Sequence, residues 1–222
     1  NTHKQITRCC HHNVDKRRMF LTMKKWLIYF FGLGVLCRSE MCDFVLVTRE
    51  EWGARPPTDV QSMQDPVPYV IIHHTYQPPA CSSTEDCIKA MQSMQDSHQI
   101  DQKWEDIGYN FVVGGDGKAY TGRGWSVVGA HSPSYNNQSI GISLIGDWRV
   151  ELPPPNQIQT ARKLIECGVQ TGKIRPDYKL YGHQQVRQGT ECPGQRLLDE
   201  ISTWDHFSKT PPFVWVPNEI PT

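Results

Sequence analysis

The sequence predicts a single α/β domain with a central, mostly parallel or mixed β-sheet flanked by three helices. Short apolar, β-branched segments alternate with segments of helical spacing along the chain, an order that is typical of α/β folds. The 222 residues contain no internal repeat and no low-complexity tract, so nothing in the pattern indicates a second folded unit.

The first elements are a strand, a helix and a hairpin. Residues 68–75 (PYVIIHHT) are apolar and β-branched, which predicts a buried strand. Ser82 and Glu85 form a capping box that predicts a helix to about Gln99. Residues 109–125 contain two short strand patterns joined by Gly-Gly-Asp-Gly, which indicates a hairpin.

The second half repeats the alternation. Residues 139–146 (SIGISLIG) predict another strand, and residues 157–171 have helical spacing that ends before Gly172, a suitable C-cap. Residues 178–183 (YKLYGH) predict a short strand, and residues 195–203 predict the last helix. These elements place the domain at residues 40–207, followed by a Pro-rich tail at residues 208–222 without a clear element.

The first 39 residues differ in charge from the rest of the chain. They hold eight of the 23 Lys and Arg residues but one of the 23 Asp and Glu residues, which leaves 15 and 22 in residues 40–222, a net charge of −7. Nucleic-acid binding needs clustered Lys and Arg to displace counterions. We therefore expect no nucleic-acid partner.

An apolar run of twelve residues, 26–37, follows Lys24 and Lys25. A membrane span needs about 20 apolar residues, whereas a signal peptide has a shorter core and a small residue for cleavage. We interpret residues 19–39 as a signal peptide and residues 1–18, which contain no methionine, as a leader from untranslated or non-native sequence. We therefore expect a secreted protein without stable membrane insertion. The alternative is that the segment is not cleaved and anchors the domain to a membrane.

Five cysteines remain after removal of this leader: Cys42, Cys81, Cys87, Cys167 and Cys192. Cysteines pair in an oxidising compartment, and an odd number leaves one thiol over. Cys81 and Cys87 close a short loop before the first helix. If Cys42 and Cys167 also pair, Cys192 has no partner.

Metal-ligating residue types occur at strand ends. His73 and His74 end one strand, His183 ends another, and Cys192 follows in GHQQVRQGTECPG. Sites of open α/β sheets form at the carboxyl ends of strands, and a catalytic zinc site needs three protein ligands and one open position. The alternatives are hydrogen-bonded structural histidines and an inert buried thiol.

From Val47 to Phe207 the chain resembles the peptidoglycan recognition proteins, a family related to the phage-type zinc amidases, and in particular its catalytic insect class known as LB. The motifs that carry the resemblance occur in order: REEWGARPP, VIIHHTY, CSSTEDC, MQDSHQ, DIGYNFVVGGDG, YTGRGW, GAHSP, IGDW, ELPP, GHQQVR and TECPG. The resemblance implies the amidase fold of that family. It also implies the disulfides Cys81–Cys87 and Cys42–Cys167.

The resemblance assigns catalytic roles. It implies that His73, His183 and Cys192 bind Zn²⁺; non-catalytic members usually have serine at the third position. Tyr109 matches the residue that donates to the developing oxyanion, and Thr190 matches a residue beside the metal-bound water. No carboxylate base is obvious, and we interpret the neighbouring Glu191 as structural.

Five positions match residues that line the family's groove for the muramyl peptide: His98, Trp104, Arg123, His131 and Asn136. The alternatives are a core histidine at 98, core packing at 104 and a surface hairpin residue at 123. Members that prefer diaminopimelate stems show Gly-Trp where this chain has Lys103-Trp104, and often an arginine that can pair with the extra carboxylate. The resemblance therefore favours a diaminopimelate-type peptidoglycan or muropeptide as partner.

We thus expect a secreted, monomeric, zinc-dependent N-acetylmuramoyl-L-alanine amidase that cleaves between the muramic acid lactyl group and the stem peptide, and so dampens innate immune signalling. The alternatives are a non-catalytic peptidoglycan receptor, a membrane-anchored receptor and a bacteriolytic effector.

One departure concerns the metal loop. Relatives place the cysteine eight residues after the histidine, whereas Cys192 lies nine residues after His183. The extra residue falls at Gln188-Gly189, and the site survives if it bulges outward, because glycine tolerates unusual backbone angles. A displacement of Thr190 or Cys192 by about 1 Å would lower the rate about 100-fold.

Overall fold

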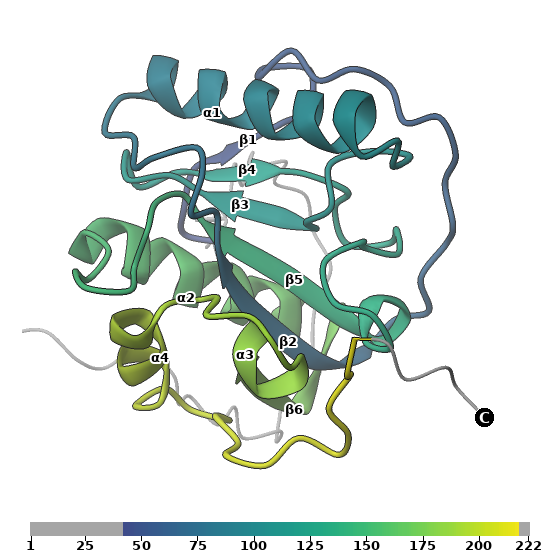
Figure 1. Cartoon of the computed structure of the whole chain (residues 1–222), viewed down its shortest axis with the longest axis vertical. Coiled ribbons are helices and arrows are strands. Elements are labelled where there is room, and N and C mark those ends of the chain that lie inside the picture. The colour runs from purple at the N-terminus through teal and green to yellow at the C-terminus, as the bar shows by residue number, and fades with distance from the viewer. Residues whose placement is uncertain (1–41, 218–222) are drawn as a thin grey trace, which may run out of the picture. The chain divides into compact units, whose positions relative to one another are not determined.

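A computed structural model describes residues 42–217 of the chain. The predicted signal peptide and leader lie outside these residues. Six strands form one sheet in the order β1-β4-β3-β5-β2-β6 (Figure 1). They are β1 (Leu46–Val47), β2 (Val67–His74), β3 (Phe111–Val113), β4 (Ala119–Thr121), β5 (Ser139–Leu144) and β6 (Ile174–Gly182). The β3–β4 pair is antiparallel and all other pairs are parallel, so the predicted mixed sheet is confirmed.

The helices are α1 (Thr84–Asp96), α2 (Pro155–Gln170), α3 (His183–Val186) and α4 (Gln195–Ile201). A π-helical turn, η1 (Ser97–Asp101), continues α1, and a 3-10 turn, η2 (Asn136–Gln138), precedes β5. The three predicted helices are present. No helix within residues 42–217 is long and apolar enough to cross a membrane.

Three local predictions need correction. The N-cap of α1 is Ser83, whose hydroxyl accepts from the Asp86 N–H at 3.2 Å, so the cap lies one residue beyond Ser82. His183 begins the one-turn helix α3 instead of ending a strand. The tail is not free of structure, because Trp215 forms an isolated parallel bridge with Arg187.

Helices cover both faces of the sheet, because alternate side chains of one strand pack against different helices. Phe111 and Val113 of β3 pack in the cluster that contains Leu164 of α2. Val112, between them, packs on the other face with Met91 of α1. The same alternation applies in β2, where Val70 and Ile72 join the α2 cluster and Ile71 joins a third cluster on the opposite face.

Within the described residues, two disulfides tie loop segments to helices. Cys42 bonds to Cys167 in α2, and Cys81 bonds to Cys87 in the first turn of α1. Cys192 is the free cysteine of the described residues. This is the pairing that the resemblance implied.

Candidate metal centre and substrate cleft

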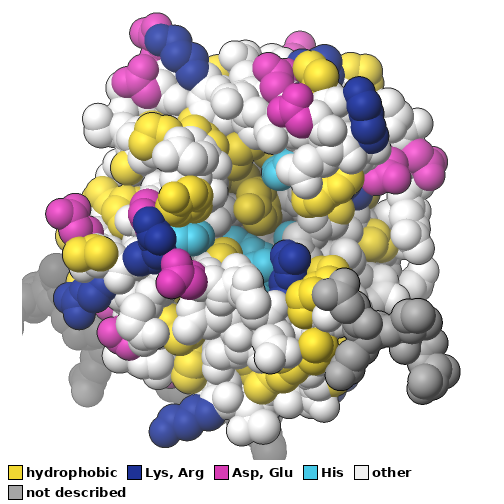
Figure 2. All heavy atoms as spheres, in the orientation of Figure 1, with side chains coloured by type: hydrophobic (Ala, Val, Ile, Leu, Met, Phe, Trp, Pro, Cys, Tyr) yellow, Lys and Arg dark blue, Asp and Glu magenta, His cyan; other side chains and the backbone are white. Residues whose placement is uncertain are grey.

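A cleft of about 510 Å³ opens where β2 and β6 end (Figure 2). Its wall combines η1, the end of β2, α3 and the loops beside them. Eight of the ten predicted catalytic, metal and substrate-binding residues line it: His73, His98, Trp104, Tyr109, His131, His183, Thr190 and Cys192. Histidine side chains gather at its floor (Figure 2).

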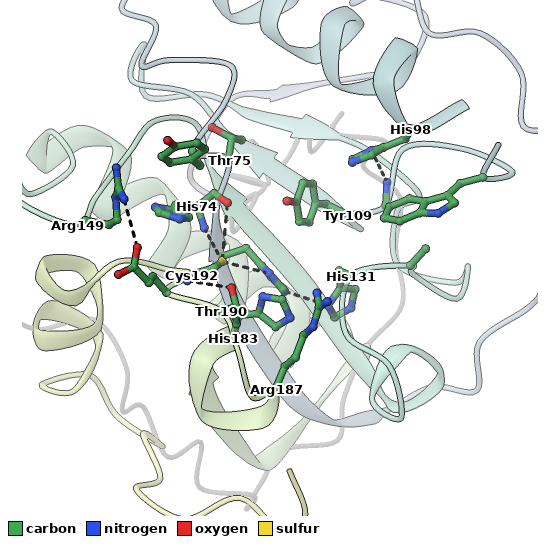
Figure 3. A pocket seen from close by; sticks show the side chains of 16 residues that line it. His74, Thr75, His98, Tyr109, His131, Arg149, His183, Arg187, Thr190 and Cys192 are labelled. Atoms are coloured by element: carbon green, nitrogen blue, oxygen red, sulfur yellow. Dashed lines mark hydrogen bonds and ion pairs between the residues drawn. The ribbon is translucent and has the colours of Figure 1, made fainter. Parts of the chain in front are cut away.

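Strand register brings two of the predicted ligands together. Ile72 of β2 is paired with Gly182 of β6 in parallel, so the next residues, His73 and His183, emerge side by side. Their ring centroids lie 4.3 Å apart. The loop between α3 and α4 returns Cys192 to the same point, and the candidate ligand atoms of the three side chains all lie within 4.8 Å of one another (Figure 3).

Alternation along β2 distinguishes the two neighbouring histidines. His73 shares the strand face of Ile71, which looks away from the α2 cluster, while His74 shares the face of Ile72. The Nδ1 atom of His74 accepts from the Trp148 N–H at 3.2 Å. His73 is therefore the histidine of the pair that joins the cluster.

The hydrogen bonds of the cluster fit a metal ion. Both ring nitrogens of His183 are buried without a hydrogen-bond partner, which is costly for a polar group that nothing binds. His73 uses Nε2 in a 3.0 Å hydrogen bond with Nδ1 of His131, and its Nδ1 lies 3.6 Å from the Cys192 sulfur. Ligand atoms on one tetrahedral zinc ion are about 3.5 Å apart.

Burial sets the protonation of the cluster. It lowers the pKa of His73 well below its ordinary value and that of His183 to about 3, and nearby positive charge, including that of Arg187, adds to both shifts. The imidazoles are therefore neutral, as metal ligation requires. Burial raises the pKa of the Cys192 thiol to about 12; a bound cation reverses that preference, because a coordinating thiol loses its proton.

The two predicted catalytic residues flank the cluster. The ring of Tyr109 lies 5.3 Å from that of His73, between centroids, and burial raises the pKa of its phenol, which keeps it protonated as a donor. The Oγ1 atom of Thr190 accepts from the Cys192 N–H at 3.2 Å. Glu191 pairs with Arg149 at 3.2 Å, away from the three ligands.

His98 and Trp104 form one side of the cleft. Their rings stack at 4.7 Å between centroids. The Nδ1 atom of His98 accepts from the Gly108 N–H at 3.1 Å, which leaves its Nε2 for other partners. Burial, and next the charge of Arg123, lower the pKa of His98 to about 4.

Arg123 and Asn136 do not line the cleft. Arg123 donates to the carbonyls of Ile107 at 2.7 Å and Val128 at 2.9 Å, and its side chain is 8% exposed. Asn136 accepts from the backbone N–H of His131 at 2.9 Å, so it supports that histidine from behind. A direct contact of Arg123 or Asn136 with the muropeptide stays a prediction.

The sequence interpretation missed several residues of the cleft. Tyr76, Arg149 and Arg187 also line it, and the His73–His131 hydrogen bond was not foreseen. Loops carry these arginines, and loops lack the periodicity that identifies buried faces. The one available signal was the place of Arg187 inside the GHQQVR motif.

The extra residue of the metal loop points outward. Gln188 and Gly189 are exposed, and Gly189 adopts a φ of +82° with nothing within 4 Å of the position of a Cβ atom. Such a φ favours glycine. The bulge therefore leaves Cys192 beside His73.

The chain is similar in sequence to known amidases and peptidoglycan recognition proteins. Residues 63–195 match the family model described as N-acetylmuramoyl-L-alanine amidase. The chain is 58% identical over 163 residues to peptidoglycan-recognition protein LB of Drosophila melanogaster, covering 73% of this chain and 70% of that protein. It is 42% identical to an N-acetylmuramoyl-L-alanine amidase of Mus musculus, over 72% of this chain and 31% of that protein.

A solved structure of a relative has the same fold. A mutant of Drosophila PGRP-LB in complex with tracheal cytotoxin superimposes with a TM-score of 0.72 at 57% identity, covering 73% of this chain and 96% of that one. The family model, the sequence identity and the fold agree in these comparisons. The chain therefore belongs to the amidase-type peptidoglycan recognition protein family.

Proposed function

We propose that this protein is a zinc-dependent N-acetylmuramoyl-L-alanine amidase. The observation that carries the proposal is the buried cluster of His73, His183 and Cys192, whose candidate ligand atoms lie within 4.8 Å of one another. Both nitrogens of His183 lack a partner there. A neutral imidazole pair with one thiolate is a ligand set that leaves the fourth zinc position open for water.

The residues around the cluster suit amide hydrolysis. Bound zinc would supply a water of lowered pKa and polarise the amide carbonyl. The phenol of Tyr109, kept protonated by burial, donates a hydrogen bond to the oxygen on which charge develops. Thr190 fixes the metal loop through the Cys192 N–H and presents its hydroxyl to the cleft.

The proposed substrate is a muropeptide, cleaved between the muramic acid lactyl group and the first stem residue. Solved relatives hold tracheal cytotoxin, a monomeric diaminopimelic acid-type peptidoglycan. The stacked pair of His98 and Trp104 gives the cleft a flat aromatic wall, and His131 lines the cleft beside His73. We therefore favour diaminopimelate-type stems, with His98, Trp104 and His131 as contacts.

We also propose secretion and a scavenging role. Both disulfides of the domain suit an oxidising compartment. Cleavage of the muropeptide outside the cell would remove the fragment that stimulates immunity, and so dampen signalling.

Hydrolysis of a purified diaminopimelate-type muropeptide, with zinc added, tests the proposal. Wild type should release free stem peptide and Cys192→Ser should not, although both bind the muropeptide and unfold at similar temperatures after chelation. Binding by wild type without release would mean that the protein is a receptor. Equal release by both proteins would refute the assigned ligand set.

A further inference from the structure

Three arginines lie in or near the cleft, and two of them are fully engaged. Arg149 pairs with Asp147 at 2.8 Å and with Glu191 at 3.2 Å. Arg123 donates to two carbonyls. Arg187 differs: among residues 42–217 it has no ion-pair partner, and its Nε is buried without an acceptor.

Arg187 is aimed at the reaction site. It follows α3 directly, and its side chain extends into the cavity toward which His183 and His131 also point (Figure 3). An unpaired cation thus faces the space beside the three candidate ligands.

The C-terminal tail holds this side chain without using its donors. The guanidinium carbon lies 5.2 Å from the centre of the Trp215 ring. The backbone around it is fixed by two 2.9 Å hydrogen bonds, from the Gln188 N–H to the Trp215 carbonyl and from the Trp215 N–H to the Val186 carbonyl. A guanidinium has five N–H donors in a fixed plane, and contact with an aromatic face leaves them available.

We propose that Arg187 binds a carboxylate of the substrate, namely the free α-carboxylate of the second stem residue; this rests on the proposed function. A guanidinium matches a carboxylate through two parallel hydrogen bonds. An extended peptide advances about 3.3–3.6 Å per residue, so that carboxylate lies about 7 Å from the cleaved amide. Stem peptides in which this group is amidated lack the matching charge, and Arg187 thereby makes the site selective for the acidic form.

Two muropeptides that differ only in a carboxylate or a carboxamide at the second stem residue test this inference. Calorimetric titration in the non-cleaving Cys192→Ser background separates binding from turnover. With Arg187 present, the acidic form should bind about 10- to 100-fold more tightly, the usual range for a hydrogen bond to a charged group. Arg187→Gln should bind both forms equally, and Arg187→Lys should retain part of the preference.

Arg175→Gln is the matched control, because Arg175 is an exposed arginine paired with Asp177 on β6 and should leave the preference unchanged. An unaltered acid-to-amide ratio in Arg187→Gln would overturn the inference, as would equal binding of both forms when Arg187 is present. Binding that discriminates through Arg187, in a protein whose wild type releases no stem peptide, would refute the amidase proposal and leave this inference standing.

Discussion

Single side chains determine how the candidate ligands of the metal site are oriented. His131 matters most here. The hydrogen bond between its Nδ1 atom and Nε2 of His73 fixes the His73 ring so that Nδ1 of His73 faces Cys192. Partners of this kind typically change metal affinity about 10- to 100-fold. Asn136 supports the same histidine from its backbone.

His131→Ala should therefore weaken zinc binding about 10- to 100-fold. His131→Asn places an amide oxygen near the position of Nδ1 and should recover much of the loss. Competition with a fluorescent chelator measures both affinities. An alanine variant with the affinity of wild type would show that the hydrogen bond does not orient the ligand.

Tyr109→Phe removes one hydroxyl and keeps the ring beside His73. We expect kcat to fall about 100- to 1,000-fold, the usual effect of removing one oxyanion donor, with little change in KM or zinc content. Steady-state hydrolysis and metal analysis check the two parts. A raised KM with unchanged kcat would instead assign Tyr109 to substrate binding.

The sequence identified His73, His183 and Cys192 through motif resemblance, and the structure places them together. It did not identify Arg187 as an unpaired cation or His131 as a partner of His73. The reason is physical: hydrogen-bond and ion-pair partners of a loop residue are set by tertiary geometry, which residue spacing along the chain does not encode.

Among the elements, β2 was predictable and α3 was not. A long β-branched run fixes β2, whereas the four residues of α3 are fewer than a helical pattern needs to be recognised. Strand alternation explains the choice between the neighbouring histidines once the buried face of Val70 and Ile72 is known. Residue types alone left that choice open.

The two disulfides should stabilise their elements unequally. Cys42–Cys167 closes a separation of 125 residues and Cys81–Cys87 one of six. Loop-closure entropy predicts that the free energy of unfolding falls by about 5 kcal/mol when the long-range disulfide is removed and by about 2 kcal/mol when the short one is removed. Urea unfolding of the two double Cys→Ala variants measures this difference, and a larger loss for the short loop would contradict the entropic account.

For the whole molecule, buried neutral histidines make stability depend on pH. Burial holds the pKa of His98 at about 4 and that of His131 at about 3, below the ordinary 6.5. The unfolded chain takes up protons below pH 6.5 while the folded chain does not, so stability is retained above 6.5 and is lost as the pH falls toward 4.

In chelated wild type, the free energy of unfolding should thus fall by about 2 kcal/mol per such histidine between pH 7 and pH 5. Urea unfolding at the two pH values measures this. His98→Asn should reduce the loss, because one titrating group is removed. A pH dependence identical to that of wild type would show that His98 is not held neutral by the fold.

The metal content of the purified protein tests the central claim most directly. After dialysis against trace zinc, wild type should hold one zinc ion per chain, and Cys192→Ser and His183→Ala should hold far less while remaining folded. The His74→Ala variant should keep its zinc, because His74 lies on the other strand face. Zinc retained in full by Cys192→Ser and His183→Ala, or absent from wild type, would contradict the metal centre proposed for this cleft.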